Sequence, residues 1–151
     1  MNAAQVFEQV EGIKALLRRI EKLPRPVVAA INGAALGGGL EIALACNYRI
    51  AIDDNKTEIG LPEVTLGLLP GAGGVTRTVR KLGIAPALLD WLLQGQRYKP
   101  AKAKEKGLVD QLVATREELL PAARQWLIDN KDNESAPRSN AAAVANAEAP
   151  T

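Results

Sequence analysis

The chain has 151 residues, a net charge of +2 and a single cysteine, Cys46. This length suggests one domain, and the near-balanced charge gives no support for a nucleic-acid or membrane-surface partner. One cysteine excludes an intrachain disulfide, which favours a reducing compartment. Because we find neither a signal peptide nor an apolar run near the roughly 20 residues of a membrane span, we expect a cytoplasmic protein.

The residue types that the sequence lacks exclude several classes of catalytic and metal site. Histidine is absent, and the only serines, Ser135 and Ser139, lie near the C-terminus. These absences exclude Ser-His-Asp hydrolysis, His-based zinc sites and a Cys-His nucleophile. Acid–base catalysis must therefore use Glu, Asp, Lys or Tyr.

Helix and strand patterns alternate along the chain, which predicts an α/β fold. From Lys131 the apolar pattern gives way to Asp, Asn, Glu, Ser, Pro and Ala. We therefore expect a domain over residues 1–130 and a disordered tail over 131–151. The expected helices are residues 3–23, 39–46, one opened by residues 71–74 and ending at 82, 84–94, 100–106 and 116–128, the last opened by a Thr115/Glu118 capping box, and the expected strands are 27–31, 48–51, 58–59 and 108–113.

Two glutamates follow residues that give the backbone unusual conformations, namely glycines in one case and a proline in the other. Glu41 follows three consecutive glycines at a predicted helix start, where free backbone N–H groups suit a developing negative charge. Glu63 lies between Pro62 and an apolar run, so burial is expected to raise its pKa toward the range of a general acid. Glu41 also has a purely structural interpretation, as a partner of the helix dipole or a solvated residue, and the corresponding alternative for Glu63 is weaker.

Residues 26–74 closely resemble the crotonase (enoyl-CoA hydratase/isomerase) superfamily, and the resemblance extends to about Asn130. The sequence of this region is most similar to that of the hydratase part of bacterial multifunctional fatty-acid oxidation proteins. The matching stretches are Pro26-Val27-Val28-Ala29-Ala30-Ile31-Asn32-Gly33, Ala35-Leu36-Gly37-Gly38-Gly39-Leu40-Glu41, Gly60-Leu61-Pro62-Glu63, and Gly67-Leu68-Leu69-Pro70-Gly71-Ala72-Gly73-Gly74 with Arg77.

The resemblance implies a partial crotonase-like ββα superhelix that hydrates a trans-2-enoyl-CoA to the 3-hydroxyacyl-CoA in fatty-acid β-oxidation. By analogy Glu41 and Glu63 hold the reacting water, Glu63 moves the proton at the carbon next to the thioester, and the Gly38 N–H is one oxyanion donor. No metal or redox cofactor is implied, because coenzyme A is part of the substrate. The implied partners are an acyl-CoA and other copies of the chain, as a trimer or a dimer of trimers.

The resemblance also implies a set of substrate contacts around these catalytic groups. The leucines among them could line an acyl pocket, although leucines at such positions are more often simply core. Cys46 is expected only to pack. The expected substrate contacts are Leu36, Gly37, Leu61, Pro62, Leu66, Leu69 and Gly71.

Two departures from the family pattern stand out. Glu63 follows Glu41 by 22 residues, slightly more than usual, and we expect the turn over residues 53–56 to absorb the excess. The family also carries a long segment before this point, with the first strands, much of the CoA-binding surface and the second oxyanion donor. Its C-terminal helices lack a counterpart too. We therefore expect a core fragment with little activity on its own.

Two functions other than hydration fit part of this pattern. An isomerase moving a Δ3 double bond to Δ2 needs only the glutamate at the Glu63 position, and a non-catalytic fragment that binds other crotonase subunits is also possible. Retention of both glutamates favours hydration. The sequence contains no Gly-x-Gly-x-x-Gly and no Gly-Lys-Ser/Thr, which excludes the usual dinucleotide and P-loop sites.

Overall fold

The structure, a computed structural model, describes residues 2–132. The predicted tail over residues 131–151 lies outside that range except for its first two residues. The elements in chain order are α1 (Ala3–Glu21), β1 (Val28–Ile31), β2 (Ala35–Leu36), α2 (Gly38–Leu44), β3 (Tyr48–Ile52), β4 (Ile59–Gly60), the 3-10 helix η1 (Pro62–Leu66), α3 (Gly74–Leu82), α4 (Ile84–Pro86), the π-helix η2 (Ala87–Leu92), β5 (Arg97–Tyr98), α5 (Pro100–Glu105), β6 (Gln111–Val113) and α6 (Arg116–Asn130).

Three strands form a parallel sheet in the order β1-β3-β6. Val28 pairs with Tyr48 and Ile50 with Gln111, so the central strand β3 has a partner on both sides. All five β3 residues are buried or half-buried, as expected for a parallel strand covered on both faces. Among the described strands, β1 pairs only with β3 and leaves its other edge open.

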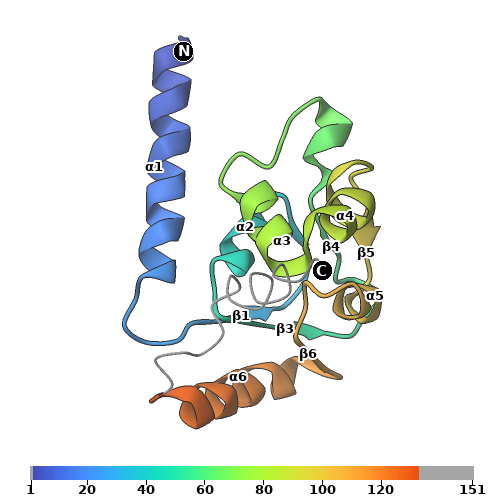
Figure 1. The fold of residues 1–151 in the computed structure, drawn as a ribbon. Coiled ribbons are helices and arrows are strands. Elements are labelled where there is room, and N and C mark those ends of the chain that lie inside the picture. Colours follow the sequence, from blue (N-terminus) through green and yellow to red (C-terminus); the bar gives the residue numbers. More distant parts are fainter. Residues whose placement is uncertain (1, 133–151) are drawn as a thin grey trace, which may run out of the picture.

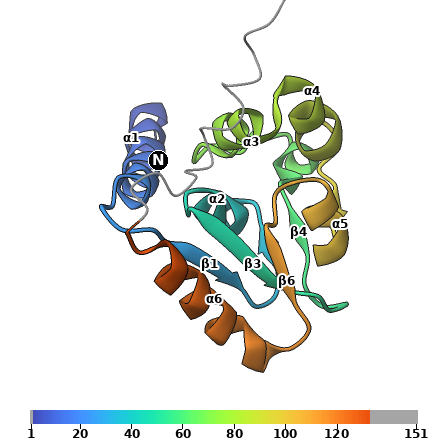
Figure 2. The ribbon, with the colours of Figure 1, turned by 60° about the horizontal axis from the view of Figure 1, so that its bottom comes forward.

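Helices cover the two faces of this sheet differently (Figures 1 and 2). The long helix α6 lies along one face, where Leu119 and Ala123 pack with Ile50 and Ile52. Trp126 of α6 also stacks on Tyr48, with ring centroids 4.6 Å apart. The other face carries the larger core, in which Leu40 and Leu44 of α2 and Trp91 of η2 are fully buried.

A second small sheet joins the two glutamate motifs. Strand β2 runs parallel to β4, pairing Ala35 with Ile59 and Leu36 with Gly60. Strand β5 pairs antiparallel with β4 on its other side. Because β2 and β4 are parallel, the segments that leave their carboxyl ends emerge at the same edge, and these segments are α2 and η1.

Most predicted elements are present, with shifted ends. The predicted helix over 84–94 is instead a short α-helix followed by a π-helix, and the predicted strand over 108–113 begins only at Gln111. Thr115 caps α6 as predicted, but Glu118 accepts from Ala114 N–H rather than from the cap residue itself, so the reciprocal capping box is incomplete. The turn over residues 53–56 is present, and Asp54 Oδ1 accepts the N–H groups of Lys56 and Thr57.

Helix α1 stands beside the rest of the fold (Figure 1). Leu17 is its only buried residue, while Val6, Phe7, Ile13 and Leu16 are exposed among the described residues. The helix keeps its own N-terminal capping box between Asn2 and Gln5. Its apolar stripe therefore meets the remainder of the described chain only in part. No helix within residues 2–132 combines the length and apolar content needed to cross a bilayer.

Candidate active site

Glu41 is held in place by the start of another helix. It lies in the first turn of α2, its residue is only 3% exposed, and its Oε1 accepts the Gly74 N–H at 2.7 Å. Gly74 begins α3, where backbone N–H groups lack intrahelical acceptors. This buried bond explains why a glycine stands at position 74, since a Cβ there would lie 2.9 Å from Glu41 Oε1 and 2.8 Å from Pro70 Cβ.

Glu63 comes from η1, directly after the fixed backbone of Pro62. Its Oε1 lies 3.0 Å from where a Cβ on Gly37 would stand, so any other residue there would crowd this oxygen. Gly37 also has φ +54° and ψ −125°, a conformation that other residues rarely adopt. Its N–H donates to the Gly60 carbonyl at 2.9 Å and continues the β2–β4 pairing toward the two glutamates.

The surroundings of Glu63 change the pKa of its carboxyl group. Burial is the main cause that raises the pKa of Glu63, the negative charge of Glu41 raises it further, and a hydrogen bond from its own backbone partly opposes them. Within the described residues, Glu63 Oε2 is buried without a hydrogen-bond partner. A carboxyl group in this setting is more readily protonated than usual and has an oxygen free to meet a ligand.

Gly38 lies at the open start of α2. It is the first residue of α2, it is exposed, and a Cβ built on it would meet nothing within 4 Å. The cap residue before it, Gly37, has no side chain that could accept its N–H. The position therefore suits a backbone donor directed at a ligand oxygen.

Comparison with known proteins shows the family of the chain. A family model for enoyl-CoA hydratase/isomerase matches residues 2–150. The chain belongs to the enoyl-CoA hydratase/isomerase family. The fatty acid oxidation complex subunit alpha of Aliivibrio fischeri is 52% identical over 109 residues, which are 72% of this chain and 16% of that protein. The corresponding subunit of Vibrio parahaemolyticus is 50% identical over 117 residues, 78% of this chain and 16% of that protein.

Solved structures of the family share the fold. An enoyl-CoA hydratase from Geobacillus kaustophilus superposes with a TM-score of 0.79 at 33% identity, covering 86% of this chain and 48% of that one. An enoyl-CoA hydratase from Bacillus anthracis gives a TM-score of 0.74 at 41% identity, covering 83% and 48%. The chain thus spans about half the length of these enzymes, as a partial crotonase-like fold.

The predicted substrate contacts of the family fall into different environments. Leu61 is fully buried in the core, whereas Leu66 and Leu69 are 74% and 76% exposed. Leu36 and Pro62 are half-buried beside the glutamates, and Gly71 is exposed. Cys46 is buried, its Sγ donates to the Ile42 carbonyl, and burial raises the pKa of its thiol, in keeping with a packing role.

Two contacts of the site could not be predicted from the sequence. The Gly74 N–H that fixes Glu41 lies 33 residues away from it, and no periodicity connects the two. Arg77, quoted above only as part of a matching stretch, is buried and pairs with Glu21 of α1 at 2.7 Å. The glycine-rich sequence of residues 71–74 was the only sequence feature that indicated a close approach of this segment to another backbone or to a carboxylate.

The raised pKa of Glu63 predicts that its contribution to the stability of the fold depends on pH. A carboxyl whose pKa is raised by folding contributes stability that is present below its unfolded pKa and is lost as the pH rises through the folded pKa. At pH 7, which is above the unfolded pKa, that contribution is reduced or lost, so the Glu63 carboxyl group is a net cost to the folded state. Glu63→Gln should raise the thermal midpoint at pH 7, and the gain should shrink toward zero near pH 4, as followed by circular dichroism.

Exposed Glu8 supplies the matched control, because Glu8→Gln removes the same charge from α1 without burial. It should leave the midpoint nearly unchanged at both pH values. A Glu63→Gln protein less stable than its parent at pH 7 would mean that the ionised carboxylate has a stabilising partner after all.

Proposed function

We propose that this chain carries the catalytic glutamates of an enoyl-CoA hydratase, which adds water syn to a trans-2-enoyl-CoA and gives the 3-hydroxyacyl-CoA of fatty-acid β-oxidation. The observation that carries the proposal is the parallel pairing of β2 with β4. It delivers Glu41 and Glu63 to one edge, close enough for the charge of Glu41 to raise the pKa of Glu63. Family membership supports crotonase-type chemistry, and the two carboxylates favour hydration within it.

The proposed mechanism divides the work among three groups. Glu41, oriented by the Gly74 N–H, and Glu63 hold the water that attacks the β-carbon. The π electrons move toward the thioester carbonyl, whose oxygen gains negative charge and is stabilised by the Gly38 N–H. Protonated Glu63 then gives its proton to the α-carbon, and the proton lost by water restores the carboxyl pair. The reaction uses no redox cofactor, because the thioester itself accepts the developing charge.

The remaining assignments complete the proposal. Leu36, Gly37, Pro62 and the exposed leucines of the η1 segment contact the acyl-CoA, and Leu61 supports them from the core. The large apolar area exposed on Leu66 and Leu69 suits a ligand or a neighbouring subunit, in line with a homo-oligomer such as a trimer. We place the working protein in the cytoplasm.

Two other functions are the alternatives to test. An isomerase needs only Glu63 to shuttle a proton between the α- and γ-carbons, and a binding module needs neither glutamate. The hydrogen bond from Gly74 to Glu41 favours hydration, because it orients a second carboxylate that an isomerase does not require.

Glu41→Gln separates these alternatives. The test protein is this chain preceded by the upstream half of a family relative, called the extended protein below. We expect Glu41→Gln to lower crotonyl-CoA hydration by about 10²-fold or more, the lower end of the range for a positioned acid or base, and to affect Δ3-enoyl-CoA isomerisation much less. Equal loss of both activities would contradict the division of roles, and unchanged hydration would remove Glu41 from the mechanism.

A further inference from the structure

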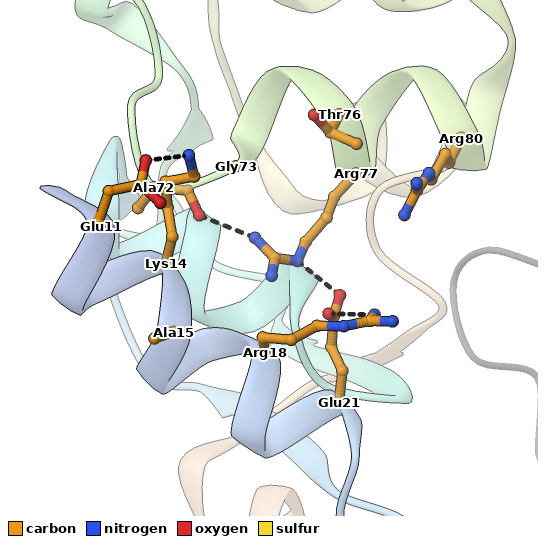
Figure 3. A pocket seen from close by; sticks show the side chains of 10 residues that line it. All are labelled: Glu11, Lys14, Ala15, Arg18, Glu21, Ala72, Gly73, Thr76, Arg77 and Arg80. Atoms are coloured by element: carbon orange, nitrogen blue, oxygen red, sulfur yellow. Dashed lines mark hydrogen bonds and ion pairs between the residues drawn. The ribbon is translucent and has the colours of Figure 1, made fainter.

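A charged hollow of about 450 Å³ lies between α1 and α3 (Figure 3). Its acidic side chains are already engaged: Glu11 with Lys14 at 2.6 Å, and Glu21 with Arg18 at 2.9 Å and Arg77 at 2.7 Å. The first two pairs lie within α1, and the Glu21–Arg77 pair joins the end of α1 to α3.

Arg77 is the centre of this arrangement. Its Nε donates to Glu21 Oε1, while its Nη1 donates to the Ala72 carbonyl at 2.9 Å. The side chains of Arg77 and Glu21 are only 8% and 9% exposed. Burial alone would raise the pKa of Glu21, but the hydrogen bonds from Arg77 and Arg18 outweigh it and hold that pKa below its usual value. The pair is thus a charged, largely desolvated contact.

The guanidinium also occupies space that Gly73 leaves free. A Cβ on Gly73 would stand 2.4 Å from Arg77 Nη1, and Gly73 has φ +103°, which other residues rarely adopt. Glycine backbone is otherwise free to rotate, so an external contact is needed to hold one conformation. Because the peptide unit is planar, fixing the Ala72 carbonyl also fixes the plane that leads into Gly73.

The fixed loop ends on the catalytic carboxylate. Gly74 follows Gly73 directly, and its N–H holds Glu41 Oε1 at 2.7 Å. We propose that Arg77, anchored by Glu21, is a positioning residue that locks residues 72–74 so that the Gly74 N–H orients Glu41. The catalytic meaning of this clamp rests on the proposed function, whereas the clamp itself is a property of the free chain. Helix α1 thereby takes part in the geometry of Glu41 through Glu21 and Arg77.

The Gly74 amide is the direct readout, observed by NMR on the extended protein without substrate. A short hydrogen bond to a carboxylate moves an amide proton downfield and slows its exchange with solvent. In Arg77→Gln we expect an upfield shift of the Gly74 amide and exchange faster by about 10- to 100-fold, the factor for one hydrogen bond to a charged group. Amides in the centre of α6 should not change, which separates the effect from a global loss of stability.

Two further variants sharpen the test. Arg80 lies three residues along α3, is exposed and makes no interaction with the residues drawn in Figure 3, so Arg80→Gln should leave the Gly74 amide unchanged. Arg77→Lys keeps the charge but cannot bridge Glu21 and the Ala72 carbonyl with a planar fork, so it should not restore the parent signal.

The outcomes decide the proposal without reference to turnover. An unchanged Gly74 amide in a folded Arg77→Gln protein, or full restoration by lysine, would overturn the clamp and leave the assignment of Glu41 and Glu63 intact. Should Arg77→Gln not fold, Glu21→Gln becomes decisive, since it removes only the anchoring charge: a shifted Gly74 amide supports the clamp and a constant one overturns it. Absence of hydratase activity would sink the proposed function and leave the NMR result standing.

Discussion

Glu63→Gln will lower crotonyl-CoA hydration by the extended protein by about 10²- to 10⁴-fold, the usual contribution of a positioned acid or base. The expectation rests on the setting of this carboxyl. Burial and the charge of Glu41 raise its pKa, and its Oε2 is buried without a partner among the described residues. Glutamine keeps the shape and can still hydrogen-bond, but it cannot give a proton to the α-carbon. The loss should therefore appear mainly in kcat, with KM little changed.

Glu105→Gln is the matched control for this experiment. Glu105 is two-thirds exposed on α5 and pairs only with its neighbour Lys102 among the described residues. Its replacement should leave the hydration rate within twofold of the parent, about the scatter expected for a surface site. Hydration close to normal in Glu63→Gln would remove this residue from the chemistry and, with it, the proposed mechanism.

A polypeptide of residues 1–151 alone should turn over crotonyl-CoA at least about 10²- to 10³-fold more slowly than the extended protein. The resemblance places the second oxyanion donor in the upstream half, and removal of one such donor costs that factor by itself. The CoA-binding surface belongs to the same half, so substrate positioning is weakened as well.

The open edge of β1 adds a structural reason for this loss. Within the described residues, β1 has a ladder partner only in β3, and a hollow of about 430 Å³ lined by small and apolar residues lies along it. Unpaired strand edges promote association, so the short polypeptide should also form oligomers or aggregates measurable by light scattering. A rate comparable with that of the extended protein would mean that the upstream half contributes little to catalysis.

Local chemistry made much of the fold predictable. The apolar run over residues 27–31 and the mostly apolar run over 48–51, which contains Arg49, predicted two strands of the parallel sheet, and the glycine triplet predicted the start of α2. The pairing of β2 with β4 was not predictable, because a two-residue strand has no period to detect. Yet this pairing is what brings the two glutamate motifs together.

The candidate catalytic residues could be predicted from the sequence, but the contacts that hold them in place could not. The resemblance named Glu41, Glu63 and Gly38, while the residues that hold them come from distant segments. Gly74 approaches Glu41 across 33 residues and Arg77 reaches Glu21 across 56. Such contacts depend on how α1, α2 and α3 pack, and no spacing in the sequence reports that packing.

Turnover of crotonyl-CoA by the extended protein is the most direct test of the central claim, that Glu41 and Glu63 together add water to an enoyl thioester. We expect loss of the conjugated thioester with formation of an equal amount of 3-hydroxybutyryl-CoA, and formation of that product at least about 10²-fold more slowly in Glu41→Gln and in Glu63→Gln. Isomerisation of a Δ3-enoyl-CoA without any hydration, or binding of the thioester without turnover of either substrate, would contradict it.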